Sequence, residues 1–164
     1  MNFTTVFTLL FALFATLLGN QTENHKFDKS LFYSVISSDD LELVDSQLRI
    51  LETAEITEKE AFEGALLMKK AGLVKNVKEK LSLFKKGNQK LEEAIVEDAQ
   101  NAEYRFLRLI IQENAPGILN YDKDIEADSL LIKNSFDSLS TIVQNAIMDY
   151  SKKSKVLNQN DFYK

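Results

Sequence analysis

Apolar residues in this chain recur at spacings of three and four rather than two. This periodicity limits the possible folds more than any other feature of the sequence. A helix with that spacing carries one apolar stripe that must be buried. The 164 residues contain one proline and five glycines, whereas a β-sandwich needs many more turn residues. The sequence therefore predicts an all-α fold. The stripe is clearest at Leu41, Val44, Leu48 and Leu51, and again at Phe136, Leu139, Val143, Ala146, Ile147 and Tyr150.

The first 18 residues carry no charged side chain and are rich in Phe, Leu and Ala. Their apolar run is shorter than the roughly 20 residues needed to cross a bilayer, and polar residues follow it from Asn20. We expect residues 1–19 to be a signal peptide and residues 20–27 to be a flexible mature N-terminus. The mature protein would then be periplasmic or extracellular. A retained N-terminal anchor is the alternative.

The chain contains no cysteine, so it offers neither a lipoprotein acylation site nor a disulfide. Core packing must therefore hold the mature region together. The net charge of -5 and the pI of about 5.0 argue against nucleic-acid binding, which depends on clustered Lys and Arg.

Capping and breaking residues divide the chain into about eight helices. Ser38 and Thr57 are expected helix caps, while Gly72 and the pair Gly87-Asn88 are expected ends. Because the connections are short, neighbouring helices should pack as stacked antiparallel hairpins in one domain over 28–155, followed by a C-terminal tail at 156–164. The predicted helices are 27–36, 39–52, 58–72, 74–86, 88–99, 102–113, 123–134 and 137–152.

Residues 91–104 resemble the junction between two tetratricopeptide repeats, in which a helix ends, a turn with Asp and Asn follows, and the next helix opens with an aromatic residue, here Tyr104. Ala94 stands where a small residue lets helices approach, although Ala99 replaces the turn proline typical of the family. The resemblance covers about one repeat and its neighbours, and no 34-residue period runs through the chain. It implies a short α-solenoid that binds a protein or peptide.

A second stripe of small residues suits close helix packing; it consists of Ala61, Gly64, Ala65 and Met68. Residues 103–108 with 112–116 also resemble an uncharacterised family of exported bacterial helical proteins, from which no activity follows.

The polar positions of the predicted helix 102–113 share one stripe formed by Arg105, Arg108 and Gln112. Two guanidiniums there can grip a carboxylate or phosphate. The alternative, which we favour, is that they pair with acids of adjacent helices. If the helix faces a partner, Tyr104, Arg105 and Arg108 are the expected anchors, because Tyr and Arg are enriched in interface hot spots.

Eight lysines and one acid, Glu79, occupy residues 69–90, around an apolar stripe of Leu73, Val77, Leu81 and Phe84. This tract can dock on an acidic partner or on anionic lipid. We favour the alternative in which the stripe belongs to the core and the lysines are solvated. Contact with a membrane surface through this tract is therefore the less favoured prediction.

Acidic residues alternate at Asp122, Asp124, Glu126 and Asp128, as in the first half of a calcium loop. Ala127 stands where such a loop needs glycine, and Lys133 stands where it needs a bidentate Glu. Acids at the start of a helix are the simpler explanation, since they complement its dipole. We predict no metal site.

No catalytic constellation is evident, because the single histidine, His25, lies in the polar mature N-terminus and no Gly-rich phosphate loop occurs. We expect neither enzymatic activity nor a cofactor. The favoured function is an exported module that binds a protein or peptide in a groove lined by alternate helices. The alternatives are a small-ligand, anion or metal carrier and a structural component of the cell envelope. The oligomeric state stays open.

Overall fold

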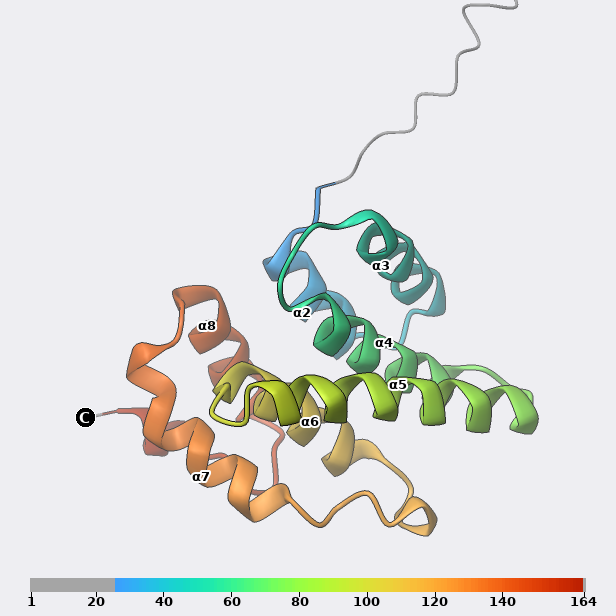
Figure 1. The fold of residues 1–164 in the computed structure, drawn as a ribbon. Helices are drawn as coiled ribbons and strands as arrows, with labels where there is room; N and C mark the ends of the chain where they lie inside the picture. The colour runs from blue at the N-terminus through green and yellow to red at the C-terminus, as the bar shows by residue number, and fades with distance from the viewer. Residues whose placement is uncertain (1–25, 164) are drawn as a thin grey trace, which may run out of the picture.

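The computed structural model describes residues 26–163 and confirms the all-α prediction over that range (Figure 1). The predicted signal peptide and His25 lie outside these residues. None of the described helices is long and apolar enough to cross a membrane. The described part of the chain forms α2 (Lys29–Ser37), α3 (Leu41–Thr53), α4 (Lys59–Leu73), α5 (Val77–Glu97), α6 (Ala102–Asn114), α7 (Ile125–Ser135) and α8 (Thr141–Tyr150), with 3-10 turns η2 (Gly117–Leu119), η3 (Phe136–Ser138) and η4 (Gln159–Phe162).

Short polar side chains cap most of these helices. Asp28, Asp40 and Asn101 each accept hydrogen bonds from two backbone N–H groups in the first turn of α2, α3 and α6. The cap of α3 is therefore Asp40, two residues beyond the expected Ser38. The helix cap expected at Thr57 is also wrong, because α4 begins at Lys59 without a side-chain capping bond.

The predicted break at Gly87-Asn88 is wrong, since residues 77–97 form the single 21-residue helix α5. Gly87 is buried where α5 crosses α4 at Gly64. A Cβ on Gly87 would lie 2.5 Å from the Gly64 carbonyl oxygen and 2.8 Å from Met68 Cγ. Glycine is needed there for the close approach of two helices, not for a turn. The stripe of small residues on α4 is accordingly buried, as predicted.

Each helix from α2 to α6 contacts the next helix along the chain, most extensively α4 with α5, and α4 also contacts α2 and α6. In Figure 1, α5 crosses the front of the molecule, with α2 and α3 above it and α7 and α8 to its left. The first and last helices also meet, because α2 contacts α8.

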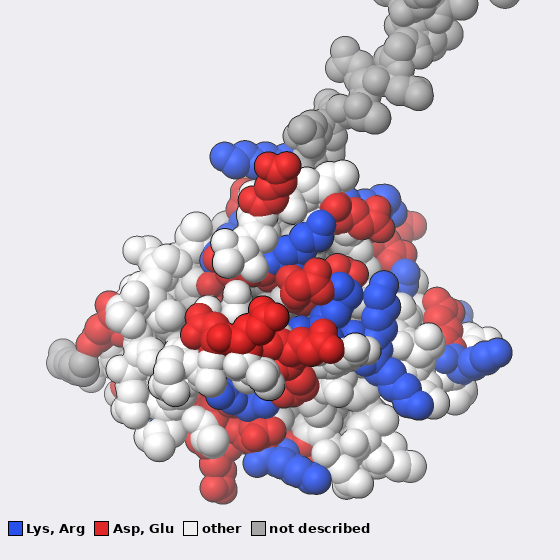
Figure 2. All heavy atoms as spheres, viewed as in Figure 1, with Lys and Arg blue, Asp and Glu red and all other residues white. Residues whose placement is uncertain are grey.

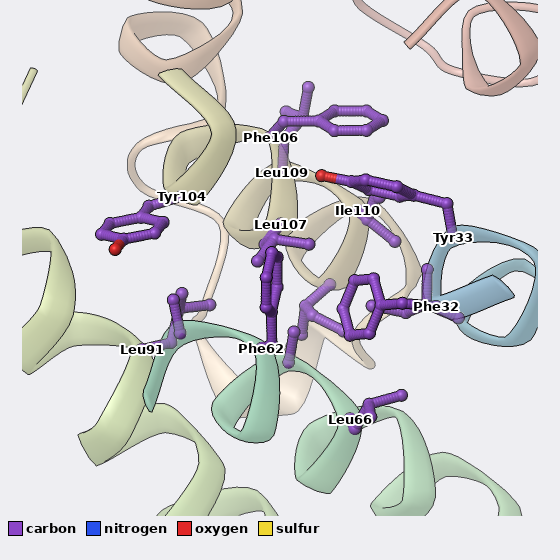
Figure 3. Packing of buried hydrophobic residues seen from close by; sticks show 14 of the residues in the cluster. Phe32, Tyr33, Phe62, Leu66, Leu91, Tyr104, Phe106, Leu107, Leu109 and Ile110 are labelled. Atoms are coloured by element: carbon purple, nitrogen blue, oxygen red, sulfur yellow. The ribbon is translucent and has the colours of Figure 1, made fainter. Parts of the chain in front are cut away.

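Aromatic rings join α2, α4, α6 and α8 in the core. Phe62 of α4 packs on Phe32 of α2 with ring centroids 4.5 Å apart (Figure 3). Phe106 of α6 lies between Tyr33 of α2 and Tyr150 of α8, 5.8 Å from each ring. The helix predicted at 102–113 corresponds to α6, which is buried along nearly its whole length.

Both ends of the described chain join this core. Phe27, which we had assigned to the flexible N-terminus, stacks on Phe62 with centroids 5.3 Å apart. In the predicted tail, Leu157 is buried and Phe162 packs on Phe136 at 4.4 Å. Leu157 and Phe162 therefore belong to the hydrophobic core and not to a free tail.

Candidate binding groove

A groove of about 690 Å³ lies where the C-terminal ends of α2, α4 and α6 meet the start of α5. The segment 115–119, which follows α6, forms one wall, and Lys153 closes the rim beyond α8. Its floor is mainly apolar and includes Ile36, Met68, Leu73, Ile110 and Ile111. The alternate helices α2, α4 and α6 thus supply half of the residues in the lining.

Three large aliphatic side chains on the rim of this groove are exposed instead of buried. Val77 is 78% exposed and Leu81 47% on α5, and Ile118 is 89% exposed on the opposite wall. Exposed aliphatics clustered around a concavity are typical of interaction sites.

All four residues of the apolar stripe in the lysine-rich tract line this groove. Leu73 and Phe84 pack partly against the core, as the simpler interpretation expected, whereas Val77 and Leu81 do not. The stripe is divided because α5 extends beyond the helices that would cover its first two turns.

Lysines outnumber acids around the groove, with Lys69, Lys80 and Lys153 against Asp39. Lys69 pairs with Asp39 at 2.9 Å, and this hydrogen bond lowers the pKa of the Asp39 carboxyl. The ammonium of Lys153 lies 5.4 Å from the centre of the Tyr150 ring. Lys80 has no ion-pair partner among residues 26–163.

Other lysines of the tract divide into two groups along α4 and α5. Lys70, Lys86 and Lys90 pair with acids of α3 or α4. At the start of α5 the described residues offer no acid partner to Lys75, Lys78, Lys80 or Lys85. Figure 2 shows several basic side chains at the right of the molecule, where Figure 1 places the start of α5, and an acidic band across its centre. The basic end of the molecule is the end that carries the groove.

The wall at 115–119 is fastened to the domain through Tyr121. The Tyr121 hydroxyl donates to Glu92 at 2.7 Å, and its ring meets Phe84 edge-on at 5.4 Å. Burial, together with the bond to Glu92, raises the pKa of Tyr121 well above its usual value. Asn120 takes a left-handed conformation (φ 46°), which turns the chain from η2 back toward Tyr121.

The predicted arginine stripe lies inside the protein, and Arg108 shares the acid Glu92 with Tyr121. Arg108 is 4% exposed and holds Asp128 bidentately, at 2.7 Å from Nε and 2.8 Å from Nη2. Its Nη1 donates to Glu92 at 2.8 Å, and Arg105 reaches the same Asp128 at 3.3 Å. Although burial opposes the charge, these carboxylates raise the pKa of Arg108 above its usual value. The arginines therefore pair with acids of α5 and α7, which is the alternative we favoured.

Tyr104 and Gln112 are also buried, at 6% and 4% exposure. Burial and nearby carboxylates raise the pKa of Tyr104. Neither amide atom of Gln112 has a hydrogen-bond partner, and the residue borders a second hollow of about 310 Å³ beside Lys155 and Val156. The structure places all four predicted site residues on α6, away from the lining of the groove.

The acidic alternation at 122–128 forms no metal centre in the described structure. Glu126 and Asp128 lie in the first turn of α7, as the dipole explanation expected, and Asp128 is occupied by the two arginines. Across residues 26–163 no group of three metal-binding side chains converges.

Comparison of the chain with family models, curated proteins and solved structures gives no match. The assignment of a site therefore depends on the geometry alone. From the sequence, docking by the lysine-rich tract, which forms the α5 side of the groove, was only the less favoured interpretation, and the opposite wall was missed. The only local signal for that wall was the pair Ile118-Leu119 between Pro116 and Asn120, where a polar loop would be usual.

Proposed function

We propose that this chain is a binding module that takes an apolar segment of another protein into the groove between α2, α4, α5 and α6. The observation that carries the proposal is the placement of exposed Val77, Leu81 and Ile118 around an apolar floor. Burying such side chains against a partner gives about 25 cal/mol for each Å² removed from water. We further propose, from the apolar N-terminal run, that this binding takes place outside the cytoplasm.

The pattern of helix contacts supports a short array of stacked hairpins similar to tetratricopeptide repeats. Pairs α2–α3, α4–α5 and α6–α7 are the hairpins of this proposal, and α2, α4 and α6 contact each other in sequence. In such arrays the first helices of successive hairpins line a shared groove. Here α2, α4 and α6 each contribute their C-terminal ends to the groove.

The test is a titration of the purified protein with a labelled amphipathic peptide that has an apolar stripe and uncharged Gln flanks. Leu81→Asp should weaken binding at least about tenfold, which corresponds to about 1.4 kcal/mol, because it places a charge on the rim of the groove. Val96→Asp is the matched control, since Val96 lies at the other end of α5, is 80% exposed and does not line the groove. Equal affinity for both variants, or no saturable binding to the wild type, contradicts the proposal.

A second candidate is a small-ligand carrier, for which the hollow beside Gln112 is the specific observation. A buried amide with two unpartnered atoms is costly unless something pairs with it. Native mass spectrometry of the untagged protein should then detect a bound small molecule that Gln112→Met removes. A single bare mass for the wild type would rule the carrier out.

A further inference from the structure

We infer that the occupant of the groove is an acidic amphipathic helix, an inference that depends on the proposed function. Its apolar stripe would face the floor of the groove, and its Glu and Asp side chains would flank that stripe and meet the lysines of the rim. The inference follows from the charges around the groove and from the secondary structure of its walls.

The charges around the groove select an acidic partner. The lining has three lysines and one acid, and that acid is engaged by Lys69. Lys75 and Lys78, beside the groove at the start of α5, add two exposed positive charges without ion-pair partners in the described structure, against one exposed acid in the same turn, Glu79. This surplus stands against the net charge of -5 for the whole chain. Complementary charges of this kind raise the rate of association and exclude basic partners.

The walls of the groove select a helix over an extended strand. A bound strand pairs its backbone with the free edge of a sheet, and residues 26–163 contain no strand. The floor is formed by the side chains of Met68, Ile110 and Ile111, which cannot satisfy the amides of an extended segment. A helix satisfies its own backbone, so it can lie on an apolar floor without that cost.

The concave shape favours a helix over a lipid surface. A flat membrane would contact exposed Val77 and Ile118 on the two rims but would leave the floor between them empty. The ridge of apolar side chains on one face of a helix can instead enter the hollow and contact the floor as well as both rims.

The experiment compares three helical peptides of about 18 residues with the same leucine stripe and with flanks of Glu, Gln or Lys. Fluorescence anisotropy with the wild-type protein should give the tightest binding for the Glu peptide, at least about tenfold tighter than for the Lys peptide. The advantage of the Glu peptide should shrink as salt is added, because exposed charges are screened.

The matched variants test where the charge preference arises. Lys80→Glu with Lys153→Glu should weaken the Glu peptide about tenfold and leave the Gln peptide within about twofold. The control pair Lys26→Glu with Lys123→Glu makes the same change in net charge at exposed lysines outside the groove, and it should change the affinity for the Glu peptide by less than about threefold.

The outcomes separate this inference from the proposed function. If all three peptides bind equally and both variant pairs behave alike, the groove binds apolar segments without charge selection, and the inference is overturned alone. If no peptide binds, both fail. Salt-sensitive pelleting with anionic vesicles in the absence of peptide binding would make a membrane the occupant, and a dimer dissociated by the peptides would make it a second copy of the chain. Either result would overturn the inference that the groove binds an acidic amphipathic helix.

Discussion

Asp128 is 1% exposed, and its carboxylate accepts three N–H bonds from Arg105 and Arg108. The chemistry of this group was foreseeable from the stripe on α6, because a guanidinium on a helix that is otherwise apolar needs a carboxylate. Which carboxylate it would take was not foreseeable, since Asp124, Glu126 and Asp128 are equivalent in the sequence. The packing of α7 on α6 brings Asp128 against both arginines, whereas Asp124 lies 3.5 Å from Nη1 of Arg108 alone.

Replacing Arg108 tests whether this network is structural. Arg108→Met should lower the free energy of unfolding by about 3 kcal/mol, because it leaves the charge of Asp128 buried with only Arg105 nearby. Urea denaturation gives the value. Adding Asp128→Leu should recover most of the loss, since an apolar pair can replace a buried ion pair. A single variant within about 0.5 kcal/mol of the wild type would mean that the arginine is not needed for stability.

Gln112 differs from Arg108, because its side-chain amide is buried without a hydrogen-bond partner. Gln112→Met keeps the length of the side chain and removes the unpaired atoms, so it should raise the free energy of unfolding by about 1 kcal/mol. Gln144→Met is the control and should lower it, because the Gln144 amide donates to the Phe136 carbonyl at 2.9 Å. Loss of stability in Gln112→Met would show that the amide is satisfied in solution.

At the scale of the element, α5 shows where local sequence signals fail. Gly87-Asn88 has the residues of a helix end, and propensity alone disfavours glycine inside a helix by about 1 kcal/mol. The tertiary contact with Gly64 outweighs that preference, because removal of both Cβ atoms lets α4 and α5 touch along their backbones. The other helices were predicted to within a few residues, since each has a polar cap or a short connection at its ends.

Two glycine-to-alanine variants separate propensity from packing. Gly87→Ala should lower the free energy of unfolding by about 2 kcal/mol, because the new Cβ collides with the Gly64 carbonyl and with Met68 and Leu67. Gly72 lies in α4, but a Cβ there would meet no atom within 4 Å. Gly72→Ala should therefore raise the free energy of unfolding by about 0.5 kcal/mol. Chemical denaturation measures both. Stabilisation by both substitutions would show that the helices do not approach as closely as described.

At the scale of the whole molecule, the spacing of apolar residues predicted the fold class, but it could not predict the groove. The groove is built from the ends of four helices, of which only α4 and α5 are close in sequence at the ends concerned, and its far wall is a loop with no helical period. Val77 and Leu81 carry the same spacing as core residues, so only the arrangement in space separates an exposed stripe from a buried one.

Buried tyrosines predict how the whole molecule responds to alkaline pH. Burial and neighbouring carboxylates raise the pKa of Tyr33, Tyr121 and Tyr150 above the ordinary value of 10.0. The unfolded chain therefore loses these protons first, and stability falls as pH rises beyond about 10. Urea denaturation between about pH 9 and 11 should show the fall, and phenolate absorbance of these three should appear only with unfolding. A phenolate signal from all tyrosines in the folded protein near pH 10 would contradict it.

The contact between α2 and α8 has a consequence for synthesis of the chain. Phe106 of α6 lies between Tyr33 and Tyr150, so one side of its ring stays uncovered until α8 has left the ribosome. A nascent chain that stalls before Thr141 would present that side to chaperones and proteases. The domain is thus completed only at the end of translation, and a premature stop codon anywhere before α8 should act as a null allele.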